Sequence, residues 1–232
     1  MSVANIRVND GTVSPTANDE AAARANRVGS AAGWGFRHRG LIAALLLTPT
    51  AVLSTFSTPA IMEGSLTDQL IDMAAWVLFL IGATLRFWAT AYIGGRKSST
   101  VVNEGPYSIC RNPLYLGSLL IAIATGLFLK SLLFAAALFV VGVAYVLVTV
   151  PHEERALAAG HAEEWDRYCA RVPRFWPRFR GWHSPQRIHV DVHAMRLEAA
   201  RASRWVWAPL LGQLMGQLRL QPWWPHLLSK LW

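Results

Sequence analysis

The sequence is poor in charged residues and in cysteine. Only 16% of its 232 residues are charged, compared with about 25% in a typical soluble domain, which argues against an ordinary cytosolic globule. Its two cysteines, Cys110 and Cys169, are too few for a disulfide framework. Neither they nor the histidines show the spacing of metal ligands. The sequence therefore predicts unpaired thiols and no metal site.

Apolar and aromatic residues are abundant instead. Hydrophobic residues make up 53% of the chain, which excludes an intrinsically disordered protein. The chain also has 11 tryptophans, a residue favoured where one side of a ring is apolar and the other is wet, as at a membrane interface. The composition therefore favours a membrane protein of one or two compact units.

The net charge of +8 is concentrated in the C-terminal part of the chain. Residues 152–232 hold 12 basic and 7 acidic residues, a net charge of +5, whereas residues 1–40 carry +2 and residues 41–151 carry +1. A basic segment can indicate nucleic-acid binding. This one follows apolar runs long enough to enter a bilayer, and it contains Trp205, Trp207, Trp223, Trp224 and Trp232. We therefore predict contact with anionic lipid headgroups and no binding of nucleic acid.

Four apolar runs predict the fold. Runs of this length and composition are typical of membrane-spanning helices. The last two, separated by Lys130 and Ser131, predict a helical hairpin. The sequence therefore predicts an all-α polytopic membrane protein with about four transmembrane helices plus cytoplasmic amphipathic helices. The runs are Leu41–Ser57, which contains Pro49, then residues 69–94, Leu114–Leu129, and Leu132–Val150, which ends at Pro151.

Composition divides the chain into three regions. Residues 1–36 are predicted to be a disordered basic leader, residues 37–177 a membrane core, and residues 178–232 a basic, Trp-rich cytoplasmic or interfacial tail. Within the core, the pattern after the fourth run predicts an amphipathic helix from about residue 152 to residue 172. In the tail, residues 178–204 are predicted to face solvent. The apolar stripe that follows is interrupted by polar residues, so we expect it to be interfacial rather than spanning.

The distribution of basic residues predicts the orientation in the membrane. Basic residues occur before the first run, between the second and third runs, and after the fourth run; they include Arg24, Arg27, Arg37, Arg39, Arg96, Lys97, Arg111 and Arg155. The two other loops hold Glu63 and Asp68 in one case and only Lys130 in the other. By the positive-inside rule, both termini and the 95–113 loop face the cytoplasm. We expect an integral protein of the bacterial inner membrane.

Two polar motifs lie on this cytoplasmic side. The first spans Gly105–Gly117 and combines Arg111 with two tyrosines and Pro113 at the mouth of an apolar helix; the second is His152–Arg155, which contains two adjacent glutamates. Each motif also has a simple explanation. The first can be an interfacial turn with a snorkelling arginine, and the second can be a pair of acidic residues favoured in the first turn of a helix. Together they also suit an electrostatic cradle for a ligand that carries both a cation and a carboxylate.

Residues from about Arg86 to Pro177 resemble the integral-membrane methyltransferases grouped as isoprenylcysteine carboxyl methyltransferases and phospholipid N-methyltransferases. The resemblance covers about 90 of the 232 residues and consists of two linked motifs with a helical hairpin between them. The matching positions are Gly105, Tyr107, Arg111–Gly117, Glu153–Leu157, Trp165, Tyr168 and Val172-Pro173.

The resemblance implies that S-adenosylmethionine binds at the cytoplasmic membrane face. Arg111 and Glu154 are the catalytic candidates, and Arg111 also suits a bidentate contact with the carboxylate of the cofactor. Arg86, an ionisable residue within or near the second run, is a candidate substrate contact, with snorkelling toward the membrane surface as the alternative. The implied cofactor-binding residues are Thr100, Val101, Val102, Tyr107, Asn112, Pro113, Leu114, Tyr115 and Glu153.

The methyl acceptor stays open at this point. The resemblance implies a lipid-soluble or lipid-attached molecule that offers a carboxylate oxygen or an amine nitrogen. Thr149 stands where the prenylcysteine enzymes have a substrate-binding arginine, so a prenylcysteine acceptor is less favoured. Asn112 replaces a commoner histidine of the family, a change that should leave cofactor binding intact. Alternatives are a phospholipid N-methyltransferase, a non-catalytic membrane scaffold that retains the fold, and a small transporter, for which the chain lacks paired broken helices.

Overall fold

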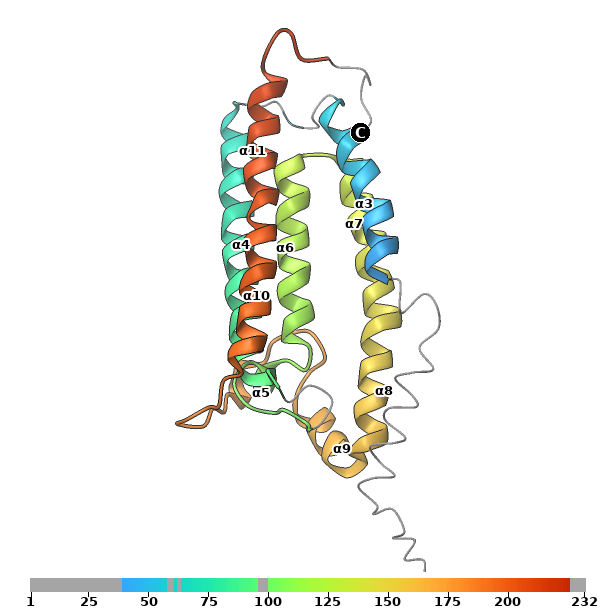
Figure 1. The fold of residues 1–232 in the computed structure, drawn as a ribbon, viewed down its shortest axis with the longest axis vertical. Helices are drawn as coiled ribbons and strands as arrows, with labels where there is room; N and C mark the ends of the chain where they lie inside the picture. The colour runs from blue at the N-terminus through green and yellow to red at the C-terminus, as the bar shows by residue number, and fades with distance from the viewer. Residues whose placement is uncertain (1–38, 58–60, 62–63, 96–99, 226–232) are drawn as a thin grey trace, which may run out of the picture.

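The computed structural model describes residues 39–57, 61, 64–95 and 100–225. The regular elements in these ranges are all helices (Figure 1), which confirms the all-α class. The predicted leader, residues 1–36, lies outside the described residues, as do Arg37, Glu63, Arg96 and Lys97. The main helices are α3 (Arg39–Thr55), α4 (Leu66–Ile93), α5 (Pro106–Ile109), α6 (Pro113–Leu129), α7 (Leu132–Ala144), α8 (Val150–Gly160), α9 (Ala162–Arg171), α10 (Val192–Trp205) and α11 (Trp207–Arg219).

The four predicted apolar runs all form helices, namely α3, α4, α6 and α7. The 28 residues of α4 and the 29 residues of the stretch Leu132–Gly160 are each long and apolar enough to cross a membrane. The two other apolar helices, α3 and α6, have 17 residues each. Pro49 lies inside α3, as expected. Side chains such as Leu80 and Phe139 point outward and are exposed, which suits a lipid environment.

The fourth run continues past Pro151, where the sequence predicted its end. A π-helical turn, Tyr145–Thr149, joins α7 directly to α8, and Pro151 lies in the first turn of α8. Proline inside a helix lacks an N–H donor, and its ring clashes with the carbonyl four residues earlier. The wider π turn accommodates that ring, so the helix does not stop. Glu153 and Glu154 therefore stand on a direct extension of an apolar helix.

The amphipathic helix predicted for residues 152–172 is in fact two helices. The break comes at His161, directly after Gly160, where the backbone leaves the helical region (φ −143°, ψ 52°). Helix α9 then buries Trp165 and Tyr168 against Val101. The break thus turns the apolar face of α9 toward the loop that contains Val101.

Charged residues meet at the turn between α6 and α7. Lys130 ends α6 in the left-handed conformation (φ 49°). Its ammonium group pairs with Asp68, and also with Asp72, whose Oδ1 lies 3.0 Å from Nζ. Because each charge has a partner, these groups can be placed at the end of an apolar helix. The predicted hairpin is confirmed, and its turn is joined by ion pairs to the start of α4.

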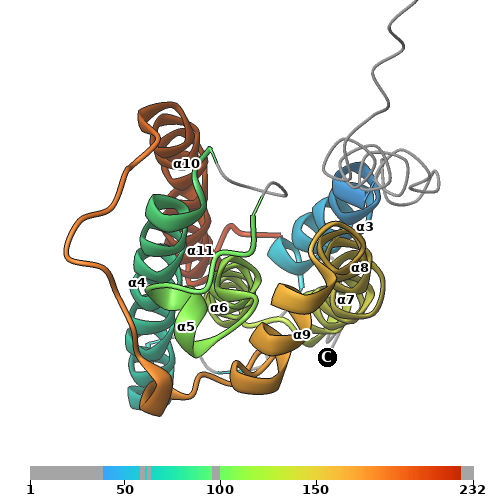
Figure 2. The ribbon, with the colours of Figure 1, turned by 90° about the horizontal axis from the view of Figure 1, so that it is seen from below.

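The C-terminal region differs most from the prediction. Residues 192–219 were expected to face solvent and then to lie at the membrane interface, but α10 packs against α4 and α11 packs against α6. Phe128 of α6 lies so near Gly212 of α11 that a Cβ on this glycine would come within 2.6 Å of the Phe128 Cβ. Trp205 packs on the core cluster that contains Phe128. The region is therefore part of the bundle, beside α4 and α6 (Figures 1 and 2).

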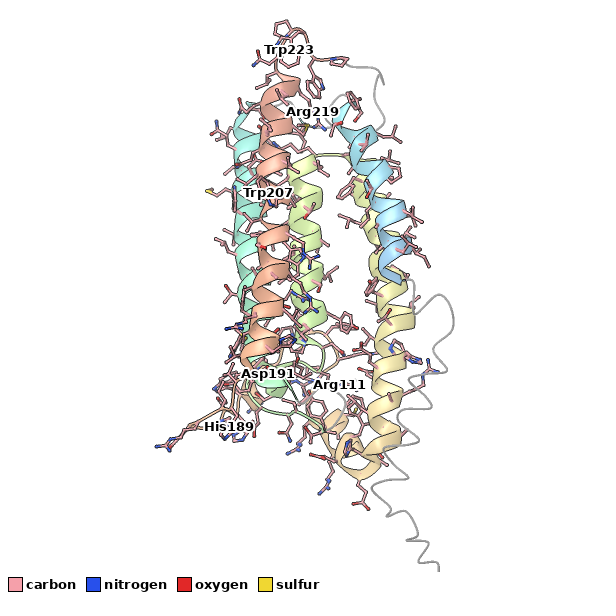
Figure 3. All side chains as sticks on the ribbon, viewed as in Figure 1. Arg111, His189, Asp191, Trp207, Arg219 and Trp223 are labelled. Atoms are coloured by element: carbon pink, nitrogen blue, oxygen red, sulfur yellow. The ribbon has the colours of Figure 1, made fainter. Side chains whose placement is uncertain are left out.

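Arg219 joins the end of α11 to two other helices. Its side chain is buried, and its guanidinium donates hydrogen bonds to the carbonyls of Ser54 and Thr55 in α3 and of Leu129 in α6. The last carbonyls of a helix lack intrahelical partners and carry partial negative charge. A single arginine thus caps the ends of α3 and α6. Arg219 and Arg111 lie at opposite ends of the bundle (Figure 3).

Candidate functional site

The loop between α4 and α6 forms one end of the bundle. Gly105 has φ +55°, a conformation that side chains disfavour, and the ring of Tyr92 fills the space that a Cβ would need. Pro106 begins the short helix α5 at the next residue, so the chain bends at Gly105. The bend places Tyr107 in a buried cluster with Tyr92 and Val102.

A later segment, residues 173–184, holds this loop in place. The N–H of Arg111 donates to the carbonyl of Pro173 (2.9 Å), and the N–H of Gly105 donates to the carbonyl of His183 (2.7 Å). These bonds join backbone groups and require no particular side chain. The sequence therefore gave no sign that residues 173–184 support the site.

A cavity of about 380 Å³ opens among these elements, a size typical of small-molecule sites. Only one of the predicted site residues does not line it: Pro113 is buried in the first turn of α6. The structure thus gathers residues from α4, the 100–112 loop, α6 and α8 at one place. The predicted residues that line the cavity are Arg86, Thr100, Val101, Val102, Tyr107, Arg111, Asn112, Leu114, Tyr115, Glu153 and Glu154.

Both carboxylate oxygens of Glu154 are engaged by neighbouring side chains. Asn112 Nδ2 donates to Oε1 (2.9 Å), and Arg174 Nη2 lies 2.8 Å from Oε2. Arg111 Nη1 lies 3.9 Å from Oε1. Because protein donors already occupy these oxygens, Glu154 is better suited to orienting Asn112 and Arg174 than to accepting a proton from a substrate.

Two polar groups that line the cavity are buried without a hydrogen-bond partner in the described part of the chain: the hydroxyl of Tyr107 and Nε of Arg111. The other side of the Arg111 guanidinium is held, since Nη1 donates to Cys169 Sγ (2.8 Å). Its centre lies 5.9 Å from the ring centroid of Trp165. A buried donor without an acceptor is destabilising by about 1–3 kcal/mol. A ligand with acceptor oxygens in this cavity would remove that cost.

Two tyrosines of the site, Tyr107 and Tyr168, remain neutral phenols. Burial, helped by the nearby Tyr168 and Glu153, raises the pKa of Tyr107 well above its usual range. Burial likewise raises the pKa of Tyr168, whose hydroxyl donates to the carbonyl of Tyr107 (2.8 Å). A phenol with a raised pKa does not ionise near neutral pH. Tyr168 therefore serves as a hydrogen-bond donor, Tyr107 retains a donor hydroxyl that a ligand can use, and neither acts as a base.

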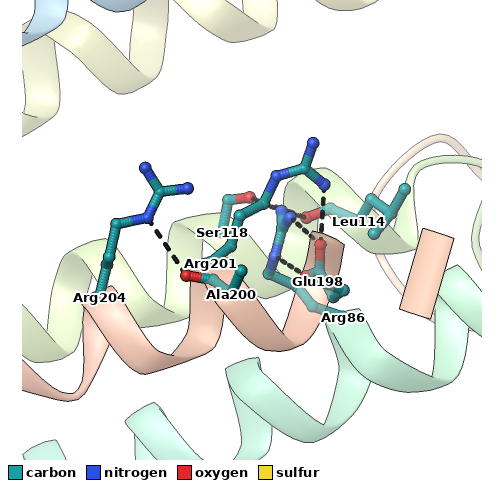
Figure 4. A network of polar contacts seen from close by, with 7 residues as sticks. All are labelled: Arg86, Leu114, Ser118, Glu198, Ala200, Arg201 and Arg204. Carbon is teal, nitrogen blue, oxygen red and sulfur yellow. Dashed lines mark hydrogen bonds and ion pairs between the residues drawn. The ribbon is translucent and has the colours of Figure 1, made fainter. Parts of the chain in front are cut away.

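Arg86 lines the cavity from α4, yet its guanidinium is bound by protein groups (Figure 4). Nε and Nη2 donate to the two oxygens of Glu198 (2.8 and 3.1 Å), and Nη1 donates to the hydroxyl of Ser118 (2.5 Å) and to the carbonyl of Leu114 (3.2 Å). The side chain points into the bundle, so snorkelling does not explain it. Arg86 joins α4, α6 and α10, and most of its donors are unavailable to a substrate.

Sequence reasoning missed Arg174 and one face of α10. The cavity is also lined by Ala194, Leu197, Glu198 and Arg201. One signal was present in the sequence, because Glu198 is the sole acidic residue of Val192–Trp205 and lies between arginines. An isolated acid on a basic helix indicates an ion pair, and here its partner is Arg86, 112 residues earlier.

Comparison with known proteins supports the resemblance. Residues 66–164 match the model of the phospholipid methyltransferase family. The chain is 32% identical over 139 residues to the nickel-cobalt-cadmium resistance protein NccN of Alcaligenes xylosoxydans xylosoxydans, and 37% identical over 121 residues to the cobalt-zinc-cadmium resistance protein CzcN of Cupriavidus metallidurans. The alignments cover 57% and 49% of this chain, and 64% and 55% of the relatives, so the chain spans less than two thirds of either relative. No solved structure matches.

Proposed function

We propose that this chain is an S-adenosylmethionine-dependent membrane methyltransferase, because residues 66–164 match the model of the phospholipid methyltransferase family. Its acceptor is a lipid-soluble or lipid-attached molecule. One observation carries the proposal: the residues that the family resemblance assigns to the cofactor come from separate segments and line one cavity. A merely interfacial turn and a merely capped helix have no need to share a cavity.

The donor and acceptor groups of the cavity suit this cofactor. The carboxylate of Glu153 lies on the cavity wall and has the charge that suits an ammonium group, and the buried Nε of Arg111 suits a carboxylate. The ring of Tyr115, which faces Tyr145 across 6.4 Å between ring centroids, suits an adenine or a sulfonium. S-adenosylmethionine, when bound, supplies an electrophilic methyl group.

The remaining work of the chain is alignment and the exclusion of water. Methyl transfer is an in-line displacement, so its rate depends on holding the acceptor in line with the methyl carbon in a dry site. Glu154 orients Asn112 and Arg174, while Trp165 and Tyr168 of α9 cover the 100–102 segment. A carboxylate acceptor needs no base, which agrees with the neutral phenols and the occupied oxygens of Glu154.

We further propose that the protein is integral to a bacterial inner membrane, with the cavity at its cytoplasmic face. The apolar helices α4 and Leu132–Gly160 support membrane insertion, and α3 and α6 complete the four predicted spans. Helices α10 and α11 run along the bundle beside α4 and α6 as a fifth crossing (Figure 1). The end of α11 then lies opposite the cavity and not at the cytoplasmic face that the sequence predicted for the C-terminus. Arginines are frequent near the cavity end after α7, which agrees with the positive-inside rule; they are Arg155, Arg167, Arg171, Arg174, Arg178 and Arg180.

The two relatives, by their names, act in resistance to nickel, cobalt, zinc or cadmium. Among the described residues, no group of three or more His, Cys, Asp or Glu side chains could hold a metal ion. We therefore propose that any part this chain plays in metal resistance runs through methylation of a membrane component. Growth on cobalt or zinc of cells that carry Glu153→Gln tests this link, because a cofactor-site variant should lose the tolerance that the wild type confers.

Binding of S-adenosylhomocysteine to the detergent-solubilised protein, measured by calorimetry, tests the central proposal. We expect binding to the wild type and at least about tenfold weaker binding to the double variant Glu153→Gln, Tyr115→Ala, since it loses a charged partner and a stacking ring. Glu164→Gln on the exposed face of α9 is the matched control. No binding to the wild type, or equal binding to the double variant, would overturn the proposal.

The methyl acceptor is then identified with a labelled methyl group and total membrane extract. Base-labile label indicates an ester, and base-stable label in the phospholipid fraction indicates N-methylation. S-adenosylhomocysteine binding without any incorporation of label would favour the non-catalytic scaffold.

A further inference from the structure

We propose that Arg201 of α10 recognises an oxyanion, either phosphate or carboxylate, on the acceptor, and that α10 forms the acceptor side of the cavity. This inference rests on the methyltransferase function proposed above. Helix α10 lies outside the segment that matches the family, residues 66–164. Nevertheless it contributes Ala194, Leu197, Glu198 and Arg201 to the cavity wall, and their spacing of three and four residues places them on one helix face.

Glu198 anchors this helix face. Its side chain is 0% exposed, and its oxygens accept hydrogen bonds from two arginines. Oε1 and Oε2 receive Nε and Nη2 of Arg86 (2.8 and 3.1 Å), and Oε2 also receives Nη1 of Arg201 (3.0 Å). A buried carboxylate requires such partners. The network therefore fixes α10 against α4 and fixes the direction of Arg201 (Figure 4).

Arg86 is the positioning residue of this network. Besides Glu198, it binds Ser118 and Leu114 of α6, and its guanidinium lies 4.5 Å from the ring centroid of Trp205. These contacts use its donors and cover its face. Of the two arginines bound to Glu198, Arg201 is the one whose guanidinium keeps donors for a ligand.

Arg201 has the exposure and the charge that such a role needs. Its side chain is 48% exposed, and among the described residues its guanidinium makes one hydrogen bond, through Nη1 to Glu198. Two arginines against one glutamate leave a net positive charge at this end of the cavity. The planar fork of an arginine fits the two oxygens of a phosphate or carboxylate. Leu197, half-exposed one turn earlier, offers apolar surface to an attached chain.

The test uses the full chain in nanodiscs of neutral phosphatidylcholine and short amphiphiles as probes. Dissociation constants for decyl phosphate, decanoate and decanol are measured by calorimetry. We expect the wild type to bind at least one of the two anions more tightly than decanol. Arg201→Gln should weaken that binding about tenfold or more, and Arg201→Lys several-fold, because lysine keeps the charge and loses the fork.

The matched control is Arg204→Gln. Arg204 lies on the same helix, but its Nε donates to the carbonyl of Ala200 (3.2 Å) and its side chain is exposed outside the cavity. This variant should bind like the wild type. Equal affinity for decanol and both anions, unchanged anion binding by Arg201→Gln or Arg201→Lys, or an equal loss in Arg204→Gln would overturn the assignment. Should Arg201→Gln fail to fold, Arg201→Lys alone decides.

The anion that binds more tightly shows whether the oxyanion of the acceptor is a phosphate or a carboxylate. A preference for decyl phosphate supports a phosphate-bearing acceptor, and a preference for decanoate supports a carboxylate-bearing one. The measurement needs neither cofactor nor methyl transfer. Binding of S-adenosylhomocysteine without anion preference would therefore overturn the role of Arg201 alone, whereas anion binding without S-adenosylhomocysteine binding would overturn the proposed function.

Discussion

Gly82 of α4 and Gly117 of α6 lie directly against each other. A Cβ on Gly82 would stand 2.7 Å from the carbonyl oxygen of Gly117, and a Cβ on Gly117 would stand 2.8 Å from that of Gly82 and 2.6 Å from Cγ of Arg86. Both positions therefore require glycine, which allows helices to approach closely. The same contact sets the place of Arg86, and through it the cavity wall.

Gly117→Ala should lower the free energy of unfolding by about 1–3 kcal/mol, because an added methyl group overpacks the α4–α6 contact. Thermal unfolding in detergent measures the effect. The matched control is Gly142→Ala in α7, where the nearest atom, Leu119 Cδ1, lies 3.9 Å from the added Cβ; this change should be neutral or stabilising. A Gly117→Ala protein as stable as the wild type would contradict the close approach.

Glu154→Ala should weaken S-adenosylhomocysteine binding about tenfold or more, because Asn112 and Arg174 lose the carboxylate that orients them. Calorimetry measures the affinity, and Glu164→Ala on the exposed face of α9 is the control. A general base would behave differently. If Glu154→Ala abolished methyl transfer but left cofactor affinity intact, a positioning role would be ruled out.

Cys110 should resist thiol reagents in the folded protein. Its side chain is 1% exposed, its thiol lies 3.3 Å from the carbonyl of Phe175, and burial raises its pKa to about 11. The thiolate is the reactive form, so at pH 7.5 its fraction is about a hundredfold below that of a thiol at the reference pKa of 9.0. Mass spectrometry after N-ethylmaleimide treatment should show reaction that accelerates as the pH approaches 11, and complete reaction after unfolding. Rapid labelling of native Cys110 at neutral pH would contradict its burial.

The two ends of the C-terminal region should label from opposite sides of the membrane. Trp176, 87% exposed, belongs to the segment at the cavity end, whereas Trp223, 66% exposed, follows α11 at the far end. With Cys110 and Cys169 replaced by alanine, an impermeant maleimide added to intact spheroplasts should label Trp223→Cys but label Trp176→Cys only after permeabilisation. Protection of both until permeabilisation would favour the cytoplasmic or interfacial placement that the sequence predicted for residues 178–232.

The helices and the convergence of the site residues on one cavity were predictable for different reasons. Length and apolarity are local properties, so α3, α4, α6 and α7 follow from composition alone. The site required a family resemblance, because nothing local indicates that residues near 101, 112 and 153 share a cavity. The continuation of the helix through Pro151 could not be predicted from local sequence. The rule that proline ends a helix is a local one, and no recognisable residue pattern indicates the π turn that accommodates Pro151 here.

The C-terminal region was misread because its partners are distant in sequence. Arg219 looks like a residue that should stay in water, but the open carbonyls of α3 and α6, up to 165 residues away, replace that water. Likewise the burial of Glu198 can be understood only from its ion pair with Arg86, which lies 112 residues earlier. Glu198 and Arg219 are buried contacts of the bundle, although hydropathy alone scores them as solvent-facing.

The position of α10 and α11 also has a consequence for biogenesis. Chains are synthesised from the N-terminus, so the family segment is complete while the helix that carries Arg201 is still in the ribosome. Under the proposed function, the cofactor side of the pocket can then assemble as soon as residues 173–184 have emerged to hold its loop, before the acceptor side exists. Docking of Arg219 onto α3 and α6 would be the last step of assembly. If the proposed function holds, the nascent protein could bind its cofactor before it could bind its acceptor.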